Sequence, residues 1–188
     1  MSVKKKSSTL SLIIKALIAA LVLTAFTHPV MRVLYPLRYD EEILKYSREF
    51  ELNEYLVMGI ISAESGFDED AQSHKSAKGL MQLKEETALW CIENLNLDAD
   101  RESIFIPEKN IYIGCAYLAY LEDLYGGNIT NAIAAYNAGL GNVNKWLSDP
   151  RYADKNGNLK IIPFAETEKY VKKVKKRAEI YHTLYGSK

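Results

Sequence analysis

The residues from Asn53 to Gly66 read NEYLVMGIISAESG and carry the clearest structural signal in the chain. Asn53 can accept hydrogen bonds from the first unpaired N–H groups of a helix. Gly66 is the residue type that most often follows a helix C-terminus. Between them the apolar residues recur at helical spacing, so we predict a helix over residues 54–64.

Glu64 lies at the end of this predicted helix, four residues after Ile60 and three after Ile61. That spacing places its carboxyl group on the apolar stripe of the helix. Burial and the negative end of the helix dipole both disfavour the ionised form, so both should raise the pKa of Glu64. A carboxyl group that stays protonated near neutral pH can donate a proton in catalysis. From spacing alone, pairing with a buried arginine or capping of a neighbouring helix is the favoured interpretation.

Outward from this segment, almost every stretch after Asp40 repeats the helical spacing of apolar residues. The further predicted helices cover residues 40–50, 85–95, 107–125, 130–138, 142–148 and 165–185. Between them we predict a loop with a short helical turn over 67–83 and a loop over 149–163. No set of alternating strands is present, so the predicted fold is all-α.

The N-terminal segment predicts export from the cytoplasm. Three lysines at positions 4–6 precede an apolar run from Leu10 to Phe26, which only Lys15 interrupts. A basic start followed by an apolar run is typical of an export signal, and this run is near the shortest that spans a bilayer. We expect an uncleaved membrane anchor with its N-terminus inside the cell, and a cleaved signal peptide is the alternative. The predicted division is a signal segment over residues 1–32, a linker over 33–39 and one folded domain over 40–188.

Charge and composition narrow the function classes. The chain has 188 residues, of which 48% are hydrophobic and 26% charged, as is typical of a folded globular protein. Residues 1–32 carry five basic side chains and no acidic one, which leaves 24 acidic and 19 basic residues in the rest of the chain. A mildly acidic domain is a poor nucleic-acid binder, so we predict no nucleic-acid partner.

The two cysteines, Cys91 and Cys115, show no CxxC spacing and no neighbouring histidine pair. We therefore predict no zinc or other metal site. Both lie in apolar helical surroundings and are predicted to be buried thiols, with a disulfide as the alternative. The 13 tyrosines suit a sugar-binding groove or the edge of the core, because the ring combines an apolar face with a hydroxyl group.

Five of the six residues from Lys172 to Arg177 are basic. On the predicted C-terminal helix they would form a solvated face with its cations toward the C-terminus. Contact with anionic lipid or an anionic wall polymer is the alternative.

Four short motifs follow one another along the chain. They are AESGF at 63–67, AQSHKSAKGLMQL at 71–83 with Thr87-Ala88 after it, AAYNAG at 134–139, and IPFAETEKYV at 162–171. In this order and spacing they resemble the catalytic domain of the soluble lytic transglycosylases, the SLT family, which has a goose-type lysozyme-like fold. The resemblance covers about residues 40–185 and implies an all-α, lysozyme-like catalytic domain.

The resemblance also implies roles for eight residues. Glu64 would be the single catalytic acid and base. The residues implied to contact the substrate are Ser73, Met81, Gln82, Tyr136, Asn137, Glu166 and Tyr170. Tyr136 and Asn137 would reach the carboxyl group and the sugar from a second helix, and Tyr170 would close the site from the last one. For each of the seven contact residues, a packing role is the alternative.

Two positions depart from the family pattern. Ser76 stands where the family usually has glycine, and it would be strained if that position needs a positive φ. Lys84-Glu85 replaces the common Met-Pro, which would remove an apolar contact with a sugar face. Neither change touches Glu64, so both bear on the detail of the groove rather than on activity.

The activity implied by the resemblance is that of a peptidoglycan lytic transglycosylase. Such an enzyme cleaves the MurNAc-β-1,4-GlcNAc bond and leaves 1,6-anhydro-MurNAc ends, with no metal or cofactor. It would act as a monomer on glycan strands, at the outer face of the bacterial cell membrane or secreted to the wall. Three alternatives stay open: hydrolysis of the same bond as in goose-type lysozyme, a chitin-directed enzyme, and a non-catalytic wall-binding scaffold.

Overall fold

The computed structural model describes residues 12–19, 27, 29–74 and 76–186, which fall into two units. The first unit extends to Leu37, and residues 12–19 and 29–34 within it are helical. The predicted apolar run from Leu10 to Phe26 lies mostly outside the described residues. Among the residues that are described, no helix is both long and apolar enough to cross a membrane. The membrane segment therefore stays a prediction.

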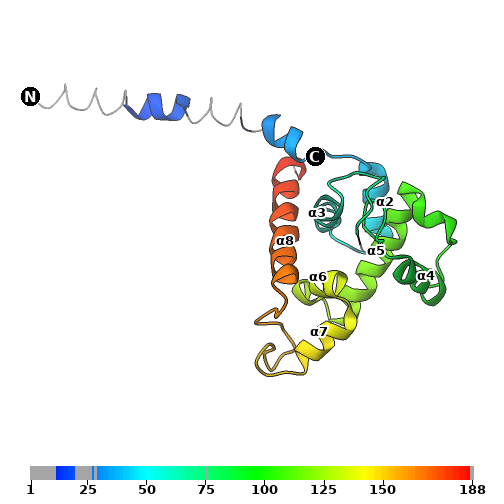
Figure 1. Cartoon of the computed structure of the whole chain (residues 1–188). Coiled ribbons are helices and arrows are strands. Elements are labelled where there is room, and N and C mark those ends of the chain that lie inside the picture. The colour runs from blue at the N-terminus through cyan, green and yellow to red at the C-terminus, as the bar shows by residue number, and fades with distance from the viewer. Residues whose placement is uncertain (1–11, 20–26, 28, 75, 187–188) are drawn as a thin grey trace, which may run out of the picture. The chain divides into compact units, whose positions relative to one another are not determined.

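The second unit, Arg38–Gly186, is helical throughout its regular structure. Its elements are α2 (Asp40–Glu49), α3 (Glu54–Glu64), α4 (Glu85–Asn94), the 3-10 helix η1 (Glu102–Phe105), α5 (Pro107–Leu124), α6 (Ile129–Ala138), α7 (Leu140–Leu147) and α8 (Ala165–Tyr185) (Figure 1). Within the described residues, β-structure is limited to three isolated bridges. The all-α prediction is confirmed, and α3 and α8 have the predicted bounds. The 3-10 helix η1 was not predicted, and α7 begins two residues earlier than predicted.

Helix α3 is the central helix of the core. The Asn53 side chain accepts hydrogen bonds from the backbone N–H groups of Tyr55 and Leu56, at 2.9 and 3.1 Å, and so caps the helix as predicted. Every residue from Leu56 to Ala63 is buried. Because α3 is buried on all sides, other elements pack around it and fix the position of its C-terminal residue, Glu64.

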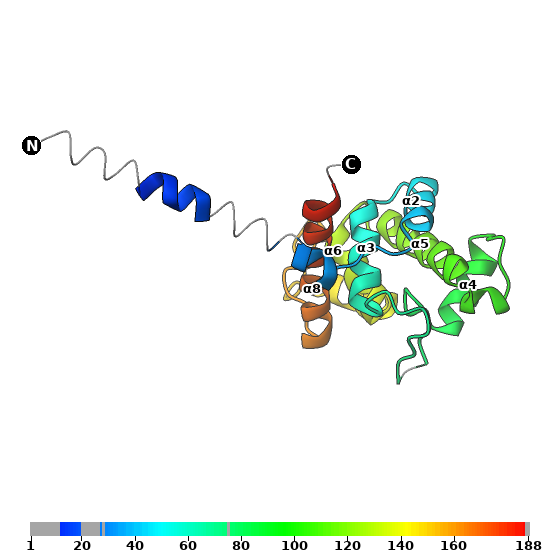
Figure 2. The same ribbon diagram turned by 90° about the horizontal axis from the view of Figure 1, so that it is seen from above.

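Helix α8 packs along most of the length of α3 (Figures 1 and 2). Gly59 makes this close approach possible, because a Cβ atom at this position would lie 2.9 Å from the carbonyl oxygen of Val174. The two helices are antiparallel, since Tyr55 at the start of α3 packs on His182 near the end of α8. The first half of α8 therefore lies beside the C-terminal end of α3.

Helix α5 supplies a further side of the core. Its residues Ile111, Cys115, Leu118 and Leu121 are fully buried. The prediction of two buried thiols is confirmed, because Cys91 and Cys115 are both buried and do not form a disulfide.

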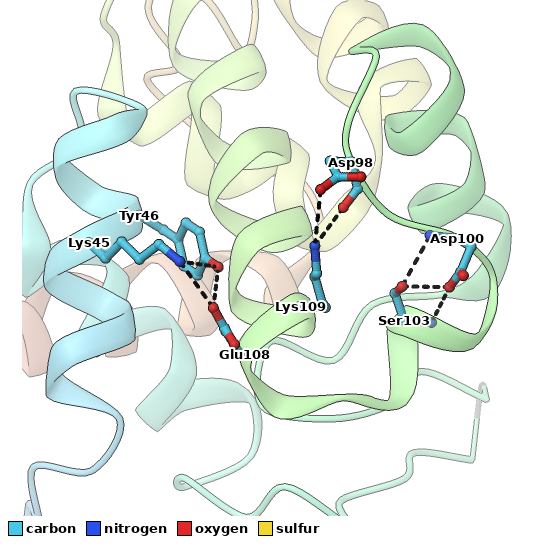
Figure 3. Close-up of polar contacts among 7 residues, drawn as sticks. All are labelled: Lys45, Tyr46, Asp98, Asp100, Ser103, Glu108 and Lys109. Carbon is cyan, nitrogen blue, oxygen red and sulfur yellow. Dashed lines mark hydrogen bonds and ion pairs between the residues drawn. The ribbon is translucent and has the colours of Figure 1, made fainter.

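Polar contacts fix the start of α5 against α2 and the turn before it (Figure 3). The Tyr46 hydroxyl donates to the Glu108 carboxylate at 2.7 Å, and the Lys45 ammonium donates to the same carboxylate oxygen at 3.1 Å. Asp100 accepts from the backbone N–H of Ser103 at 2.8 Å and orders the approach to η1. The Lys45–Glu108 ion pair is exposed and contributes little free energy, so the buried core remains the main source of stability.

Candidate functional site

A cavity of about 280 Å³ lies where the C-terminal end of α3 meets α6 and the start of α8. Ser73, Ala77 and Gln82–Lys84 line its opposite side, and they belong to the described residues of the stretch 66–84, which we call the site loop. Six of the eight predicted site residues line this cavity: Glu64, Ser73, Gln82, Tyr136, Asn137 and Glu166. Residues from four separate stretches of the sequence are thus brought to one place.

The Glu64 carboxyl group is half-buried in this cavity. The Tyr170 hydroxyl donates a hydrogen bond to Glu64 Oε1 at 2.6 Å. Burial raises the pKa of Glu64 to about 7, although the Tyr170 hydrogen bond and the positive charge of Lys173 act in the opposite direction. A carboxyl group with this pKa is present in both protonation states near neutral pH, so it can donate a proton and later accept one.

The end of α3 that carries Glu64 is fastened by two cations from α8. The Lys173 ammonium donates to the carbonyl oxygen of Ala63 at 2.6 Å. The Arg177 guanidinium donates to the backbone carbonyl of Ser62 and, at 2.8 Å, to its hydroxyl oxygen. These groups satisfy carbonyls that have no partner within the helix, and they oppose its negative dipole end. Two residues of the predicted basic cluster therefore contact α3, where a solvated face was expected.

Lys173 itself is affected by this position. Desolvation and the nearby Arg177 charge lower the pKa of Lys173, while the Glu64 carboxyl group acts in the opposite direction. Across the α3–α8 contact, the Lys173 ammonium therefore lowers the pKa of Glu64, and the Glu64 carboxyl group raises the pKa of Lys173.

Two tyrosines supply neutral hydroxyl groups next to Glu64. Burial, reinforced by the negative charge of Glu64, raises the pKa of both Tyr136 and Tyr170 well above the usual value. The Tyr136 hydroxyl donates to the carbonyl oxygen of Met81 at 3.0 Å, and its ring packs on Tyr117. Both side chains therefore stay protonated at physiological pH and add no charge to the cavity.

Asn137 joins α6 to α8 at the cavity wall. Its side-chain oxygen accepts a hydrogen bond from the Thr167 hydroxyl at 2.8 Å. Glu166 precedes that threonine and is exposed at the cavity rim. The AAYNAG and ETEKYV motifs are thus in direct contact although 30 residues separate the hydrogen-bonded pair.

The site loop is held by hydrogen bonds to its own backbone. The Gln82 side-chain amide donates to the carbonyl oxygens of Ala71 and Gly79, at 2.8 and 2.9 Å. The Ser73 hydroxyl oxygen accepts from the N–H of Ala77 at 3.0 Å. Ser73 and Gln82 therefore shape the loop as well as lining the cavity, and their contact with substrate stays a proposal.

Several loop residues adopt left-handed backbone conformations. Ser76 has a φ of 60° and Gln82 a φ of 48°. Ser76 therefore has the positive φ under which strain was predicted, and serine is strained there relative to glycine.

Met81 does not line the cavity, in contrast to the implied role. Its side chain is fully buried against Gly114 of α5, where an added Cβ would lie 2.3 Å from its sulfur atom. Its backbone reaches the site instead, because its carbonyl oxygen accepts from Tyr136 and its N–H donates to Asn110. Met81 thus supports the cavity through its backbone, while its side chain packs in the core.

Asn110 supports the site although it was not predicted to do so. This buried side chain accepts from Met81 N–H at 2.8 Å and donates to the carbonyl oxygens of Lys78 and Ile104, at 3.1 and 3.0 Å. Its position four residues before Gly114 places it on a buried face of α5, and a polar residue on such a face was the available signal.

Lys173 and Arg177 were noticed only as members of a basic cluster. Their spacing of three and seven residues after Tyr170 places all three on one helix face, which could have been recognised. No group of three or more metal-ligating side chains lies together anywhere in the described parts of the chain.

Comparisons with known proteins agree with this geometry. The family profile described as "Transglycosylase SLT domain" matches residues 41–158. The soluble lytic murein transglycosylase of Salmonella typhimurium is 34% identical over 157 residues, which cover 82% of this chain and 24% of that protein. The membrane-bound lytic murein transglycosylase C of Cronobacter sakazakii is 32% identical over 170 residues, or 77% of this chain and 46% of the relative.

Solved structures give the same result for the fold. An inactive glutamate-to-glutamine mutant of the lytic transglycosylase Slt from Pseudomonas aeruginosa matches with a TM-score of 0.74 and 31% identity, over 84% of this chain and 26% of that one. The soluble lytic transglycosylase SLT70 of Escherichia coli matches with the same TM-score and identity, over 83% and 26%. The expected SLT-type helical fold is confirmed. The chain spans about a quarter of the length of the soluble relatives that it matches.

Proposed function

This chain belongs to the transglycosylase SLT domain family, and on that premise we propose that it is a lytic transglycosylase of peptidoglycan with Glu64 as its acid and base. The observation that carries the proposal is the half-buried Glu64 carboxyl group in the cavity, with a pKa of about 7 and a hydrogen bond from Tyr170. The relatives are soluble and membrane-bound lytic murein transglycosylases, which supports murein as the substrate.

In the proposed first step, Glu64 donates its proton to the oxygen that joins MurNAc C1 to GlcNAc. The C1–O bond breaks, the GlcNAc end leaves as an alcohol, and C1 gains oxocarbenium character. In the second step the MurNAc C6 hydroxyl oxygen attacks C1, and its proton passes to the Glu64 carboxylate. The 1,6-anhydro ring closes, Glu64 is protonated again and no water is consumed. Because one group acts first as acid and then as base, a pKa near the working pH suits both steps.

Neighbouring side chains are proposed to position the substrate. Tyr136 and Tyr170 stay neutral near Glu64, so their hydroxyl groups can orient donors and acceptors without adding a charge beside the carboxyl group. Ser73, Gln82, Asn137 and Glu166 line the same cavity and are proposed to contact the sugars. Met81 is proposed to act through its backbone, which holds Tyr136 in place.

The test is fragment analysis of purified cell walls digested with the whole chain. We expect mass spectrometry to show anhydro-muramic ends, and we expect Glu64→Gln to reduce turnover by roughly 10²- to 10⁴-fold while sacculus binding is largely retained. Reducing muramic ends would identify a hydrolase instead. Equal binding by both proteins with no cleavage by either would identify a wall-binding scaffold. Faster cleavage of chitin oligomers than of peptidoglycan would identify a chitin-directed enzyme.

We further propose that the chain acts outside the cytoplasm as a monomer tethered by its N-terminal segment. The lysines before the apolar run from Leu10 to Phe26 support export, and one of the relatives is described as membrane-bound. Fractionation of cells that produce the whole chain should place it in the membrane pellet, released by detergent and not by salt. Recovery of a shortened chain in the soluble fraction would favour a cleaved signal peptide.

A further inference from the structure

Lys84 is the cation on the wall of the candidate active site. It lines the cavity that holds Glu64, and it also lines a second, polar cleft together with Gln72, Ser76 and Glu86. Of the described residues that line the first cavity, Lys84 alone carries a positive charge. Because Lys84 belongs to both hollows, its side chain lies where the two adjoin.

The backbone of Lys84 is firmly placed. The residue caps the N-terminus of α4, and its carbonyl oxygen accepts from the N–H of Ala88 at 2.9 Å. The preceding Leu83 exchanges two backbone hydrogen bonds with Lys78, at 3.0 and 3.1 Å. The Lys84 side chain is exposed, and no hydrogen bond or ion pair to another described residue engages its ammonium group. A fixed backbone therefore presents an available cation to the cavity.

Of the other three charged side chains that line the second cleft, two already have partners. The Lys78 ammonium lies over the Phe105 ring, 4.3 Å from its centre. Glu85 forms an ion pair with Arg101. Glu86 is the remaining acid of this cleft, and it is exposed to solvent. The local charge pattern leaves Lys84 as the side chain suited to an anionic group on a ligand in the cavity.

Peptidoglycan strands carry such a group in a defined place. Every MurNAc bears a lactyl arm, which ends in a free carboxylate or is joined to a peptide that has carboxylates of its own. Chitin strands have no equivalent. The methionine common at this position in the family offers only an apolar contact, whereas a lysine ammonium attracts and hydrogen-bonds a carboxylate.

We infer that Lys84 is a specificity-determining residue that binds a carboxylate on the lactyl arm of MurNAc, either its own or that of the attached peptide. The inference rests on the proposed function of the same cavity. It makes the preferred substrate a strand with negatively charged arms rather than a neutral amino-sugar strand. Since the ammonium is exposed, we expect a modest contribution, roughly threefold to tenfold in kcat/KM, that weakens as salt is added.

The experiment measures kcat/KM of the whole chain on four substrates. These are peptide-bearing strands and strands whose peptides have been removed enzymatically, each used untreated and after chemical amidation of the carboxylates. We compare the wild type with Lys84→Met, Lys84→Arg and the control Lys145→Met, which removes an exposed cation of α7 outside both hollows. Thermal melting of each variant checks that the fold is retained.

We expect Lys84→Met to lose roughly threefold to tenfold on untreated strands through KM, and to match the wild type on amidated strands. Lys84→Arg should restore most of the loss, and Lys145→Met should behave as wild type. A loss on peptide-free strands alone assigns the contact to the lactyl carboxylate, which is free only there. A loss on peptide-bearing strands alone assigns it to a carboxylate of the peptide, and a loss on both shows that Lys84 binds either one.

Two results would overturn the inference and leave the proposed function standing. One is an unchanged Lys84→Met on untreated strands, and the other is an equal loss on untreated and amidated strands, which would indicate a purely structural role. Absence of cleavage by the wild type on all four substrates would instead reject the proposed function.

Discussion

The helical wall of the cavity, formed by the end of α3 with α6 and α8, differs from the site loop in what holds it. On the helical wall, Glu64 ends a helix that is buried on every side, and Gly59 lets α8 pack closely against it. The site loop has no regular secondary structure. Its shape depends on backbone hydrogen bonds, on residues with a left-handed backbone conformation such as Ser76, and on the side chain of Asn110.

This difference gives the two sides of the cavity different roles. Burial in the helical wall gives Glu64 its raised pKa, because desolvation needs a rigid and well-packed surround. The site loop presents polar and charged groups, Ser73, Gln82 and Lys84, at the other side of the cavity. We therefore expect changes in the helical wall to alter proton transfer, and changes in the loop to alter stability or substrate choice.

The largest effect is expected when the site loop loses the support that it receives from α5. Asn110→Ala removes three hydrogen bonds and leaves backbone groups of Met81, Lys78 and Ile104 without that partner. Buried polar groups without partners are costly, so we expect a loss of roughly 3–5 kcal/mol in the free energy of unfolding. Urea denaturation measures it. Asn94→Ala is the matched control, because its amide is exposed and makes one bond to Trp90, and it should change stability by under about 0.5 kcal/mol. Similar values for both variants would contradict the role given to Asn110.

The next effect concerns the cost of burying Glu64 in the helical wall. Its pKa rises from the ordinary 4.5 to about 7 on folding, so the folded protein binds the proton more tightly than the unfolded chain. The resulting stabilisation is fully present below pH 4.5 and is lost as the pH rises through 7. Glu64→Gln cannot ionise and escapes this loss. Its stability relative to wild type should increase by about 3 kcal/mol between pH 4 and pH 8, as measured by denaturation at both values. A difference that does not change with pH would show that Glu64 is not buried as described.

A smaller effect is expected from the hydrogen bond across the helical wall. Tyr170 donates to the carboxylate and favours its ionised form, so Tyr170→Phe should raise the pKa of Glu64 further. The alkaline limb of the pH-rate profile should then move upward by ~1–2 pH units. Tyr125→Phe is the control, since it removes a comparable hydroxyl bond to Asn144 on the surface. A downward shift, or none, would show that the Tyr170 hydrogen bond does not lower the pKa of Glu64.

The smallest effect tests strain in the site loop. Ser76→Gly relieves a left-handed backbone, which costs serine about 1–2 kcal/mol, but glycine loses about 0.5–1 kcal/mol more entropy on folding. We expect a net gain of about 0.5 kcal/mol in a thermal or urea unfolding experiment. Ser148→Gly, at a φ of −79°, has no strain to relieve and should lose stability. Loss of stability in both variants would show that Ser76 is not strained.

Local rules predicted the helices well and the site loop poorly. The bounds of α3 and α8 follow from an asparagine cap, a terminal glycine and the spacing of apolar residues, all of which act within a few residues. Met81 is a residue whose side-chain position such local rules did not predict. The motif alone placed its side chain in the groove, but the side chain is buried because Gly114 of α5 leaves a space that it fills.

The amino-acid sequence by itself determined the helical character of the chain, the position of Glu64 on an apolar stripe and the order of the four motifs. These depend on interactions between near neighbours in the chain. The tertiary structure decided which groups surround that carboxyl group. Tyr170, Lys173 and Arg177 reach the end of α3 from more than 100 residues away, and Asn110 supports a loop about 30 residues before it. Helix spacing cannot specify contacts at such separations, because they exist only once α3, α5 and α8 have packed together.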